Sequence, residues 1–290
     1  MIRGVSYVIV TPVRDEEGHV DATVRSVLSQ TMSPSEWIIV NDGSSDRTGN
    51  IIDQYAAKVP WIHVIHRRNR GFRKSGGGVI EAFYDGYRAL RHDDWEFIVK
   101  LDGDLTLPPD YFEKCFEHFN HQPALGIGGG VICHKVDGEL RVETNPKFHV
   151  RGATKIYRKA CWDAIGGLWS VPGWDTIDEV KANMLGWKTY AFDDLHLVHH
   201  RFTGLSDGLL RDRVKHGLAC YMSGYHPLFV AASCLYRTAQ KPYIVGSAAI
   251  LYGFLKAHLD HVPRVEDRAY MAYIRDQQLK RLCGMQTIWR

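Results

Sequence analysis

Four apolar runs rich in β-branched residues, each closed by a polar break, constrain the fold of the first hundred residues most strongly. They occupy residues 5–13, 37–42, 61–65 and 95–101. Apolar residues at helical spacing follow the first three runs, as in the segment from Val20 to Leu28. Strands and helices that alternate at this pitch predict an α/β fold, with a mainly parallel sheet and helices on both of its faces.

The alternation becomes looser beyond residue 125. We expect there a strand at 126–134, a hairpin turn at 136–141, helices at 153–165 and 173–186, and strands at 187–193 and 195–200. From residue 206 onward the pattern is helical, with Pro227, Pro242 and Pro263 as breaks. The sequence therefore predicts a sheet domain at 1–205 and a helical C-terminal region at 206–290.

The composition argues against several classes of protein. A formal net charge of +3, without a dense run of Lys and Arg, argues against a nucleic-acid partner. The six cysteines contain no Cys-x-x-Cys pair, which favours reduced thiols over a zinc or redox motif. The first residues lack the hydrophobic region of a signal peptide. We therefore expect a cytoplasmic protein, with the inner face of the plasma membrane as an open alternative.

Acidic residues follow three of the four predicted strands at the point where each strand ends. Asp15 and Glu16 follow the first strand, Asp42 ends the second, and Asp102 and Asp104 follow the fourth. An Asp-x-Asp triplet alone is expected by chance in a chain of this length, so its position carries the inference. Ligands of parallel sheets bind beyond the carboxyl ends of the strands. A divalent cation held by paired carboxylates at this edge could bind a diphosphate.

A basic cluster follows the third predicted strand. It comprises residues 67–70 together with Arg73 and Lys74, and three glycines at 76–78 open the next helix. Because this loop leaves the same edge of the sheet, we expect its cations to lie beside the carboxylates and to bind phosphate. A solvated loop is the alternative for the cluster, and a flexible hinge is the alternative for the glycines.

Three segments in this order resemble motifs of the family 2 glycosyltransferases. Residues 11–16 are similar to the Pro-x-Asn-Glu-Glu segment of that family, with Arg14 in place of the usual asparagine. Residues 40–48 nearly match its second motif, and residues 101–104 resemble its Asp-x-Asp segment. The resemblance implies the GT-A fold, a Rossmann-like sheet with helices on both faces. Within it, 1–104 would be the nucleotide-binding half and 105–205 the acceptor half.

The resemblance also implies a reaction and its partners. Family members move a sugar, with inversion, from a nucleotide-diphosphate sugar to an acceptor. Here the acceptor would be a saccharide or a lipid-linked compound in bacterial surface polysaccharide or glycolipid synthesis. The cofactor implied is a divalent metal, Mg²⁺ or Mn²⁺, which would neutralise charge on the departing diphosphate.

The site residues carried over from the family fall into two groups. The expected nucleotide-binding residues are Thr11, Pro12, Arg14, Glu16, Asp42, Arg73, Lys74 and Asp102, of which Arg73 and Lys74 rest on loop position alone. The expected metal ligands are Asp102 and Asp104, with His199 as a third. A histidine at a strand end is also common as ordinary hydrogen-bonded structure, and this alternative stays open for His199.

The candidate catalytic base lies at the start of the helix that closes with Gly186. In the family this base is the aspartate of a Glu-Asp pair, and counting back from Gly186 places Asp175 at that position, with Trp174 where the glutamate usually stands. Asp178 shares a helix face with Asp175 and is the second candidate base. The alternative for both is complementation of the helix dipole.

The C-terminal third contains two long uncharged runs, at 217–236 and 243–255. Their polar residues, prolines and length make them poor membrane spans. A helical lid and a pair of helices lying on a membrane surface, flanked by Arg237, Lys241 and Lys256, are the two alternatives.

Two other functions compete with a glycosyltransferase. A nucleotidyltransferase would need a glycine-rich basic loop directly after the first strand, and residues 12–16 do not supply one. A transferase-like domain that binds nucleotide or a partner without turnover is favoured only by Trp174.

Overall fold

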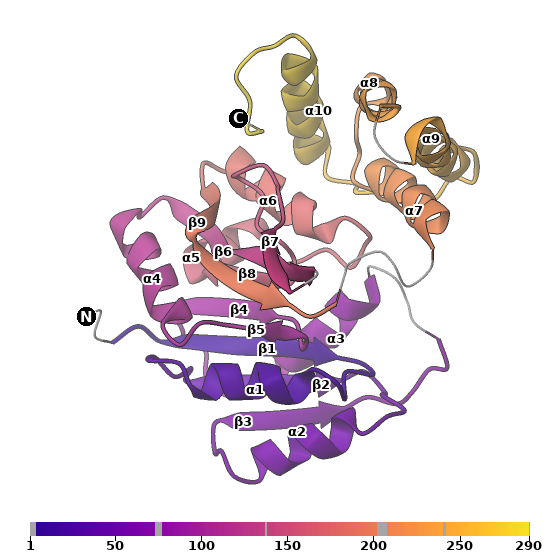
Figure 1. Cartoon of the computed structure of the whole chain (residues 1–290). Helices are drawn as coiled ribbons and strands as arrows, with labels where there is room; N and C mark the ends of the chain where they lie inside the picture. The colour runs from indigo at the N-terminus through magenta and orange to yellow at the C-terminus, as the bar shows by residue number, and fades with distance from the viewer. Residues whose placement is uncertain (1–3, 73–76, 137, 202–207, 240–241, 290) are drawn as a thin grey trace.

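The computed structural model describes residues 4–72, 77–136, 138–201, 208–239 and 242–289. Figure 1 shows a sheet domain with helices packed against it and a group of helices, α7 to α10, gathered at one end. The central sheet runs in the order β3-β2-β1-β4-β8-β6-β9-β5, and β7 pairs with β6.

The first half of the domain follows the sequence pattern closely. Its strands are β1 (Tyr7–Val13), β2 (Glu36–Asn41), β3 (Ile62–His66) and β4 (Phe97–Leu101), and its helices are α1 (Val20–Leu28), α2 (Thr48–Ala56) and α3 (Gly77–Arg88). All pairings among these four strands are parallel. The strand and helix units expected in this region are therefore confirmed.

The alternation of side chains along β1 separates two cores. Ile9 faces the helices α1 and α2 and packs in one cluster with Val24 and Ile52. Val8 and Val10 belong to the opposite cluster, which contains Phe83 of α3 and other residues of that helix. Successive side chains of a strand point to opposite faces, so one buried strand supports both layers of helices.

The second half of the sheet is largely antiparallel. It consists of β5 (Leu105–Thr106), β6 (Leu125–Val136), β7 (Glu139–Val142), β8 (Thr154–Arg158) and β9 (Lys188–His199), with helices α4 (Tyr111–His121), α5 (Lys159–Ile165) and α6 (Trp174–Met184). The strand β8 lies antiparallel between β4 and β6. The α/β fold class is confirmed, although parallel pairing is limited to β1–β4 and to β6 with β9.

Two expectations for this half are wrong in detail. The helix expected at 153–165 begins only at Lys159, because Thr154–Arg158 forms the strand β8. The two strands expected at 187–193 and 195–200 form one strand, β9, whose pairing with β6 shifts register between Gly130 and Val131. A local irregularity of this kind breaks the apolar alternation that sequence patterns rely on.

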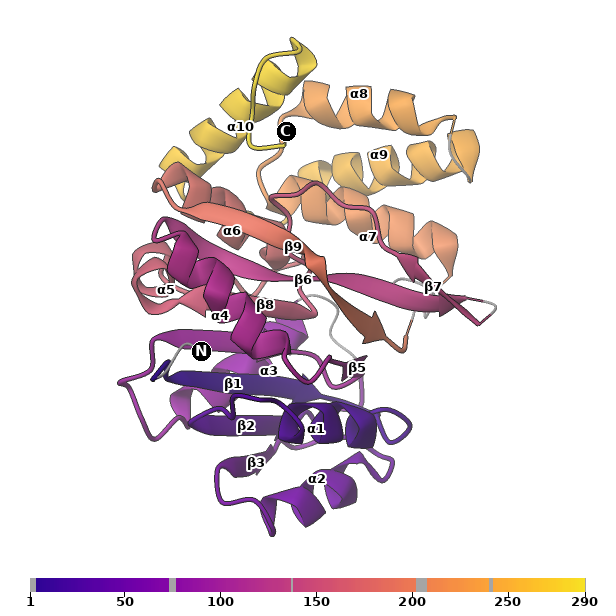
Figure 2. The same cartoon turned by 60° about the vertical axis from the view of Figure 1, so that its left-hand side comes forward.

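The C-terminal region consists of α7 (Leu209–Met222), α8 (Pro227–Arg237), α9 (Tyr243–Leu259) and α10 (Arg268–Leu282). Figure 2 shows α9 between α7 and α8, with α10 against the sheet domain. A Cβ atom at Gly217 would lie 2.0 Å from the Ile250 carbonyl oxygen, and one at Gly253 would lie 2.1 Å from that of Val214. Two glycines thus let α7 and α9 pack backbone to backbone. No helix within the described ranges is long and apolar enough to cross a bilayer.

Candidate active site

The segments that follow β1, β2 and β4 meet at one edge of the sheet. These strands are parallel neighbours, so Asp15, Asp42 and Asp102 leave the sheet on the same side. A Cβ atom at Gly103 would lie only 2.5 Å from Val13 Cγ1. Glycine at this position therefore allows the Asp-x-Asp loop to lie against the end of β1.

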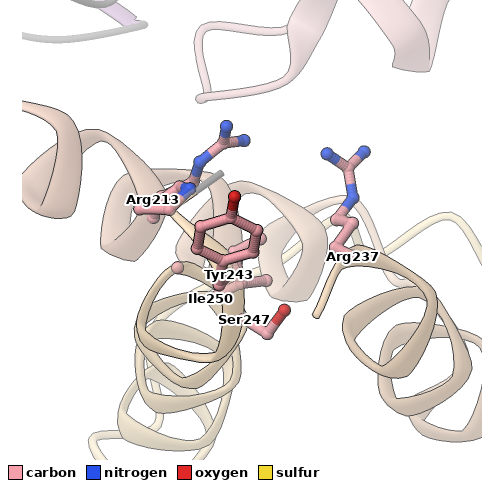
Figure 3. Close-up of a pocket in the computed structure, with 7 residues that line it drawn as sticks. Arg213, Arg237, Tyr243, Ser247 and Ile250 are labelled. Carbon is pink, nitrogen blue, oxygen red and sulfur yellow. The ribbon is translucent and has the colours of Figure 1, made fainter. Parts of the chain in front are cut away.

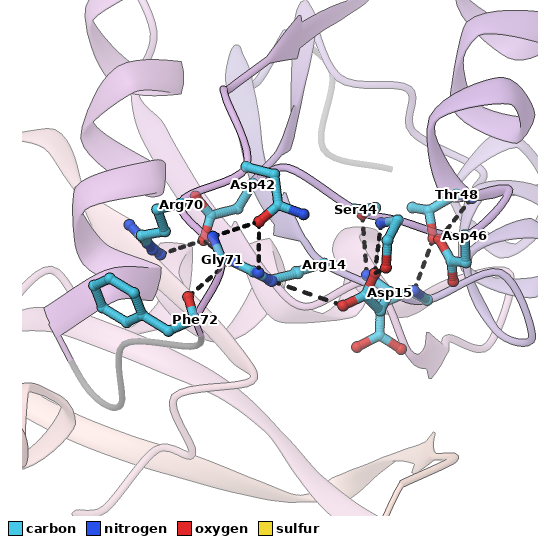
Figure 4. A network of polar contacts seen from close by, with 12 residues as sticks. Arg14, Asp15, Asp42, Ser44, Asp46, Thr48, Arg70, Gly71 and Phe72 are labelled. Carbon is cyan, nitrogen blue, oxygen red and sulfur yellow. Dashed lines mark hydrogen bonds and ion pairs between the residues drawn. The ribbon is translucent and has the colours of Figure 1, made fainter.

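Two arginines of the loop after β3 contact Asp42, the residue expected to bind the base of the nucleotide. Arg67 Nη1 donates to Oδ1 and Arg70 Nη2 to Oδ2, each at 2.5 Å. Arg14 lies 4.0 Å from Oδ2 of the same carboxylate (Figure 4). The basic loop thus shares the edge of the carboxylates, whereas Arg73 and Lys74 lie outside the described residues. Each carboxylate oxygen has two lone pairs, so Asp42 keeps acceptor capacity for a base.

The first two family motifs hold each other in place. The Glu16 amide donates to Thr48 Oγ1 at 2.8 Å, and the Ser45 amide donates to Asp15 Oδ1 at 2.8 Å. Asp46 accepts the amide of Thr48 at the start of α2 (Figure 4). Much of the second motif therefore braces the loop that carries Asp15 and Glu16. Thr11 and Pro12 lie within the buried strand β1, and the Thr11 hydroxyl accepts a hydrogen bond from Trp37 Nε1.

His199 lies next to Asp104, as expected from the sequence. The pairing of Leu105 in β5 with His199 in β9 brings the two together, with His199 Nε2 3.2 Å from Asp104 Oδ2. Arg201 Nη2 donates to Glu16 at 2.6 Å, and Arg201 Nε lies 4.0 Å from Asp104. Burial raises the pKa of Asp104, but the hydrogen bond with His199 and the nearby positive charges outweigh it and hold the pKa below its ordinary value.

Asp102 is held by a buried lysine on the preceding strand. Lys100 Nζ forms an ion pair with Asp102 Oδ1 and donates to the Gly152 carbonyl at 2.6 Å. Burial raises the pKa of Asp102, and the Lys100 charge only partly opposes this. Within the described ranges, no three His, Cys, Asp or Glu side chains are grouped to hold a metal ion. The expected set of Asp102, Asp104 and His199 is thus not assembled as one cluster.

The residues nevertheless fit a cation that is shared with the substrate. Mg²⁺ usually takes one or two protein carboxylates and completes its shell with water and substrate phosphates. Asp104 with His199 supplies such a partial shell, because His199 Nε2 faces Asp104 Oδ2. Among the described residues, the buried His199 Nδ1 has no hydrogen-bond partner. A site that is completed by a diphosphate does not need three protein ligands.

Asp175 lies in the first turn of α6, after Gly173 with φ 83°. A Cβ atom at Gly152 would lie 3.2 Å from the Cβ of Asp175, and the Gly152 carbonyl accepts from Lys100. The contacts from Asp102 through Lys100 and Gly152 therefore connect the candidate nucleotide and base positions. Burial raises the pKa of Asp175, but the charges of His149, Lys155 and Arg151 outweigh it and hold the pKa below its ordinary value.

Asp178, the second candidate base, faces the interior. Both of its carboxylate oxygens lie 2.9 Å from Lys155 Nζ, and Oδ2 also accepts from the Tyr157 hydroxyl at 2.5 Å. Burial raises the pKa of Asp178 to about 6. Glu179 is equally buried, and it accepts from the Val150 amide at 2.6 Å. This geometry favours Asp175 over Asp178 as a group that could reach an acceptor.

Lys100 and Lys155 are the site residues that the sequence reasoning missed. Their Nζ atoms lie 5.3 Å and 5.5 Å from the ring centroid of Trp174, which stands where the family usually has glutamate. Lys100 is the one charged residue of the apolar strand β4, whereas the strand β8 of Lys155 also contains Thr154 and Arg158. A lone cation inside an apolar strand is rare unless it is paired, so the sequence held such a signal for Lys100 but not for Lys155.

Comparison with known proteins agrees with the geometry. A family model described as "Glycosyl transferase family 2" matches residues 8–170. The chain is 34% identical over 140 residues to "Uncharacterized glycosyltransferase EpsJ" of Bacillus subtilis (strain 168), covering 48% of this chain and 37% of that protein. It is 26% identical over 205 residues to "Poly-beta-1,6-N-acetyl-D-glucosamine synthase" of Staphylococcus epidermidis, covering 66% of this chain and 47% of that protein. The chain thus spans less than half the length of these relatives.

Two solved structures share the fold. The mannosyltransferase PcManGT from Pyrobaculum calidifontis, in complex with GDP-Man and Mn²⁺, aligns with a TM-score of 0.55 at 15% identity, covering 97% of this chain and 88% of that one. S. aureus TarS residues 1–349, in complex with UDP-GlcNAc, align with a TM-score of 0.54 at 14% identity, covering 95% and 81%. At this identity the likeness concerns the fold alone.

Proposed function

This chain belongs to glycosyl transferase family 2, and from that premise we propose that it transfers a sugar from a nucleoside-diphosphate sugar to an acceptor hydroxyl. Transfer occurs with inversion and depends on Mg²⁺ or Mn²⁺. The observation that carries the proposal is the position of Gly152, whose carbonyl accepts from Lys100, the ion-pair partner of Asp102, and which lies beside Asp175. It supports one site that a donor-binding Asp102 and a candidate base Asp175 would share.

The nucleotide-binding residues lie on the edge formed by β1, β2 and β4. Asp42 accepts a hydrogen bond from the base of the donor nucleotide, and Arg67 and Arg70 orient the Asp42 carboxylate. Asp102 binds the ribose, and Pro12 and Glu16 border the nucleoside. Arg73 and Lys74, which lie outside the described residues, would add positive charge for binding the diphosphate.

Asp104, together with His199, would hold the divalent cation, with Asp102 nearby. When bound, the cation stabilises negative charge on the departing diphosphate. Arg201 lies 4.0 Å from Asp104 and adds a second positive charge at the same place. These groups act on the leaving-group side of the anomeric carbon.

Asp175 acts on the opposite side as general base. It takes the proton from the acceptor hydroxyl while the oxygen attacks the anomeric carbon and the bond to the diphosphate breaks. The low pKa of Asp175 keeps the carboxylate charged at neutral pH. A pocket is lined in part by Glu143, His149 and Arg151, and the charges of His149 and Arg151 act on Asp175. These side chains could form hydrogen bonds with a sugar acceptor. Lys155 and Asp178 fix the first turns of α6 and thereby position Asp175.

The setting that we propose is the assembly of a surface polysaccharide or glycolipid, because several relatives carry such names. The acceptor would be a saccharide or a lipid-linked compound. A cytoplasmic enzyme at the inner face of the plasma membrane would meet both the nucleotide sugar and such an acceptor.

The test begins with a screen of nucleotide sugars by thermal shift, with and without Mn²⁺. Transfer and hydrolysis of the best donor are then compared in the wild type, Asp175→Asn and the exposed control Asp163→Asn. We expect Asp175→Asn to lower turnover at least 100-fold while donor binding is retained. Turnover that survives this change removes Asp175 from the mechanism. Binding without turnover in the wild type supports the non-catalytic alternative.

Asp104→Ala tests the cation separately. We expect it to abolish the Mn²⁺-dependent part of nucleotide binding and to leave metal-independent binding in place. Metal-dependent binding that is undiminished in Asp104→Ala would contradict the proposed cation site.

A further inference from the structure

Exposed apolar side chains are concentrated on α7, α8 and α9. Of the 19 large apolar side chains that are exposed in the described part of the chain, 12 lie between residues 209 and 259. Those of α9 that recur at helical spacing form what we call the apolar stripe: Ile244, Leu251, Tyr252, Leu255 and Leu259. Leu235 and Tyr236 of α8 are 74% and 75% exposed. A surface of this extent on one set of helices marks an interaction site.

The charge of the same segment is mostly positive. Residues 209–259 contain six Lys and Arg residues and one acidic residue, Asp212. Lys256 reaches forward to Asp260 at 2.6 Å. For Arg213 and Arg237, no acidic partner is found among the residues that the structure describes. Cations that border an exposed apolar face are typical of helices that lie on anionic membranes.

Arg213 of α7 and Arg237 of α8 line one shallow pocket at the start of α9. Figure 3 shows both guanidinium groups extending toward the same side, with the Tyr243 ring between them and Ser247 beneath. Tyr243 has a φ of 58°, a left-handed conformation that is rare for a bulky residue. Two guanidinium groups and the Tyr243 hydroxyl are donors suited to a phosphate group, whereas Ser247 Oγ donates to the Cys234 carbonyl at 2.8 Å.

We propose that α7, α8 and α9 form a docking surface for an anionic phospholipid bilayer, with a lipid phosphate bound between Arg213 and Arg237 and the apolar stripe in the interfacial layer. The excess of positive charge over 209–259 argues for a bilayer over a second copy of this chain, whose matching face would carry the same excess.

The docking surface lies near the site of the proposed sugar transfer. Only this argument about its position rests on the proposed function. A Cβ atom at Gly173, the N-cap of α6, would lie 2.8 Å from Ser223 Oγ at the C-cap of α7. Ser223 and Arg213 are separated by ten residues of sequence, or about 15 Å along a helix. A lipid headgroup at Arg213 would therefore lie within reach of the acceptor side of the site.

The test is co-sedimentation of the full chain with vesicles of phosphatidylcholine alone and of phosphatidylcholine with equimolar phosphatidylglycerol. We expect binding to the anionic vesicles, with an affinity about 30-fold lower in the double variant Arg213→Gln/Arg237→Gln. Arg25→Gln/Arg88→Gln removes the same charge from the sheet domain and should leave binding unchanged. Ile244→Ser/Leu251→Ser should also weaken binding, whereas the exposed control Leu185→Ser should not.

Several results would overturn the proposal. These are equal binding to both kinds of vesicle, equal binding by the arginine variant and its control, and a wild type that forms a dimer but does not bind vesicles. Inorganic phosphate that stabilises the wild type but not the arginine variant, without vesicle binding, would indicate a free phosphate ligand instead. Donor hydrolysis measured in parallel separates the two proposals, because we expect it to be unchanged in Arg213→Gln/Arg237→Gln.

Discussion

One buried charge, that of Lys155, fixes the helix turn that carries the candidate base Asp175. Lys155 is fully buried and lies 2.9 Å from both Asp178 and Glu179, so it neutralises two carboxylates that have left water. Its Nζ also donates to the backbone carbonyl of Asp175 at 2.5 Å. A group of this kind contributes little net stability by its presence, but removing one partner is costly.

Lys155→Met should therefore destabilise the protein by about 3–5 kcal/mol at pH 7, because two buried carboxylates lose their cation. Urea denaturation followed by circular dichroism measures the change. Lys114→Met, which removes an exposed lysine paired with Asp110, is the control and should leave the midpoint nearly unchanged. A variant as stable as the wild type would mean that Asp178 and Glu179 are not both charged.

The lowered pKa of Asp175 predicts how kcat/KM depends on pH. Burial favours the neutral acid, but His149, Lys155 and Arg151 together hold its pKa below the ordinary value. Its stabilising contribution is then complete above the ordinary pKa of about 4 and is lost as the pH falls through the lower value of the folded state. We expect kcat/KM to show no loss from protonation of Asp175 between pH 7 and about pH 5.

The matched variant is Arg151→Gln, which removes one of the three cations. The acid limb of its kcat/KM profile should move to higher pH. An acid limb that is the same in both proteins would show that Arg151 does not act on the carboxylate of the candidate base Asp175.

At the scale of the elements, the loop from β4 to β5 depends on its one glycine. A methyl group at Gly103 would meet Val13 Cγ1 at 2.5 Å and come within 3.9 Å of Glu16 Cγ. Gly103→Ala should shift the loop that carries Asp102 and Asp104, at a cost of about 1–3 kcal/mol in stability. Metal-dependent donor binding, measured by calorimetry, should weaken at least tenfold. Gly18→Ala is the control, because no atom lies within 4 Å of the added group.

The sequence was most informative where elements are local. The units from β1 to β4 could be predicted because each strand is one apolar run, and each of the first three is followed by a helix with its own period. The strand β8 was predicted as helix because Thr154–Arg158 continues into α5 without a break, and its pairing with β4 is distant in sequence. The direction of the strands predicted that Asp42 and Asp102 share one edge of the sheet. It did not predict that Lys100 and Lys155 pair with Asp102 and Asp178, because only the packed structure shows which buried charges form ion pairs.

The C-terminal helices share a core with the second half of the sheet domain. Ile177 and Val180 of α6 are packed in one cluster with Tyr270 and Ile274 of α10. The divide expected after residue 205 lies outside the described residues, and this cluster joins the two regions on either side of it. The helix that carries Asp175 is therefore partly supported from beyond the sheet domain.

This arrangement predicts that a change in α10 acts on the site from a distance. Ile274→Ala should cost about 2–4 kcal/mol, because a fully buried side chain leaves a cavity against α6. If α6 is displaced, turnover should fall while donor binding stays near the wild-type value, because the nucleotide edge belongs to β1, β2 and β4. Leu282→Ala, in the same helix but 44% exposed, is the control for both measurements. A stability loss without any change in turnover would mean that the sheet domain alone fixes the position of Asp175.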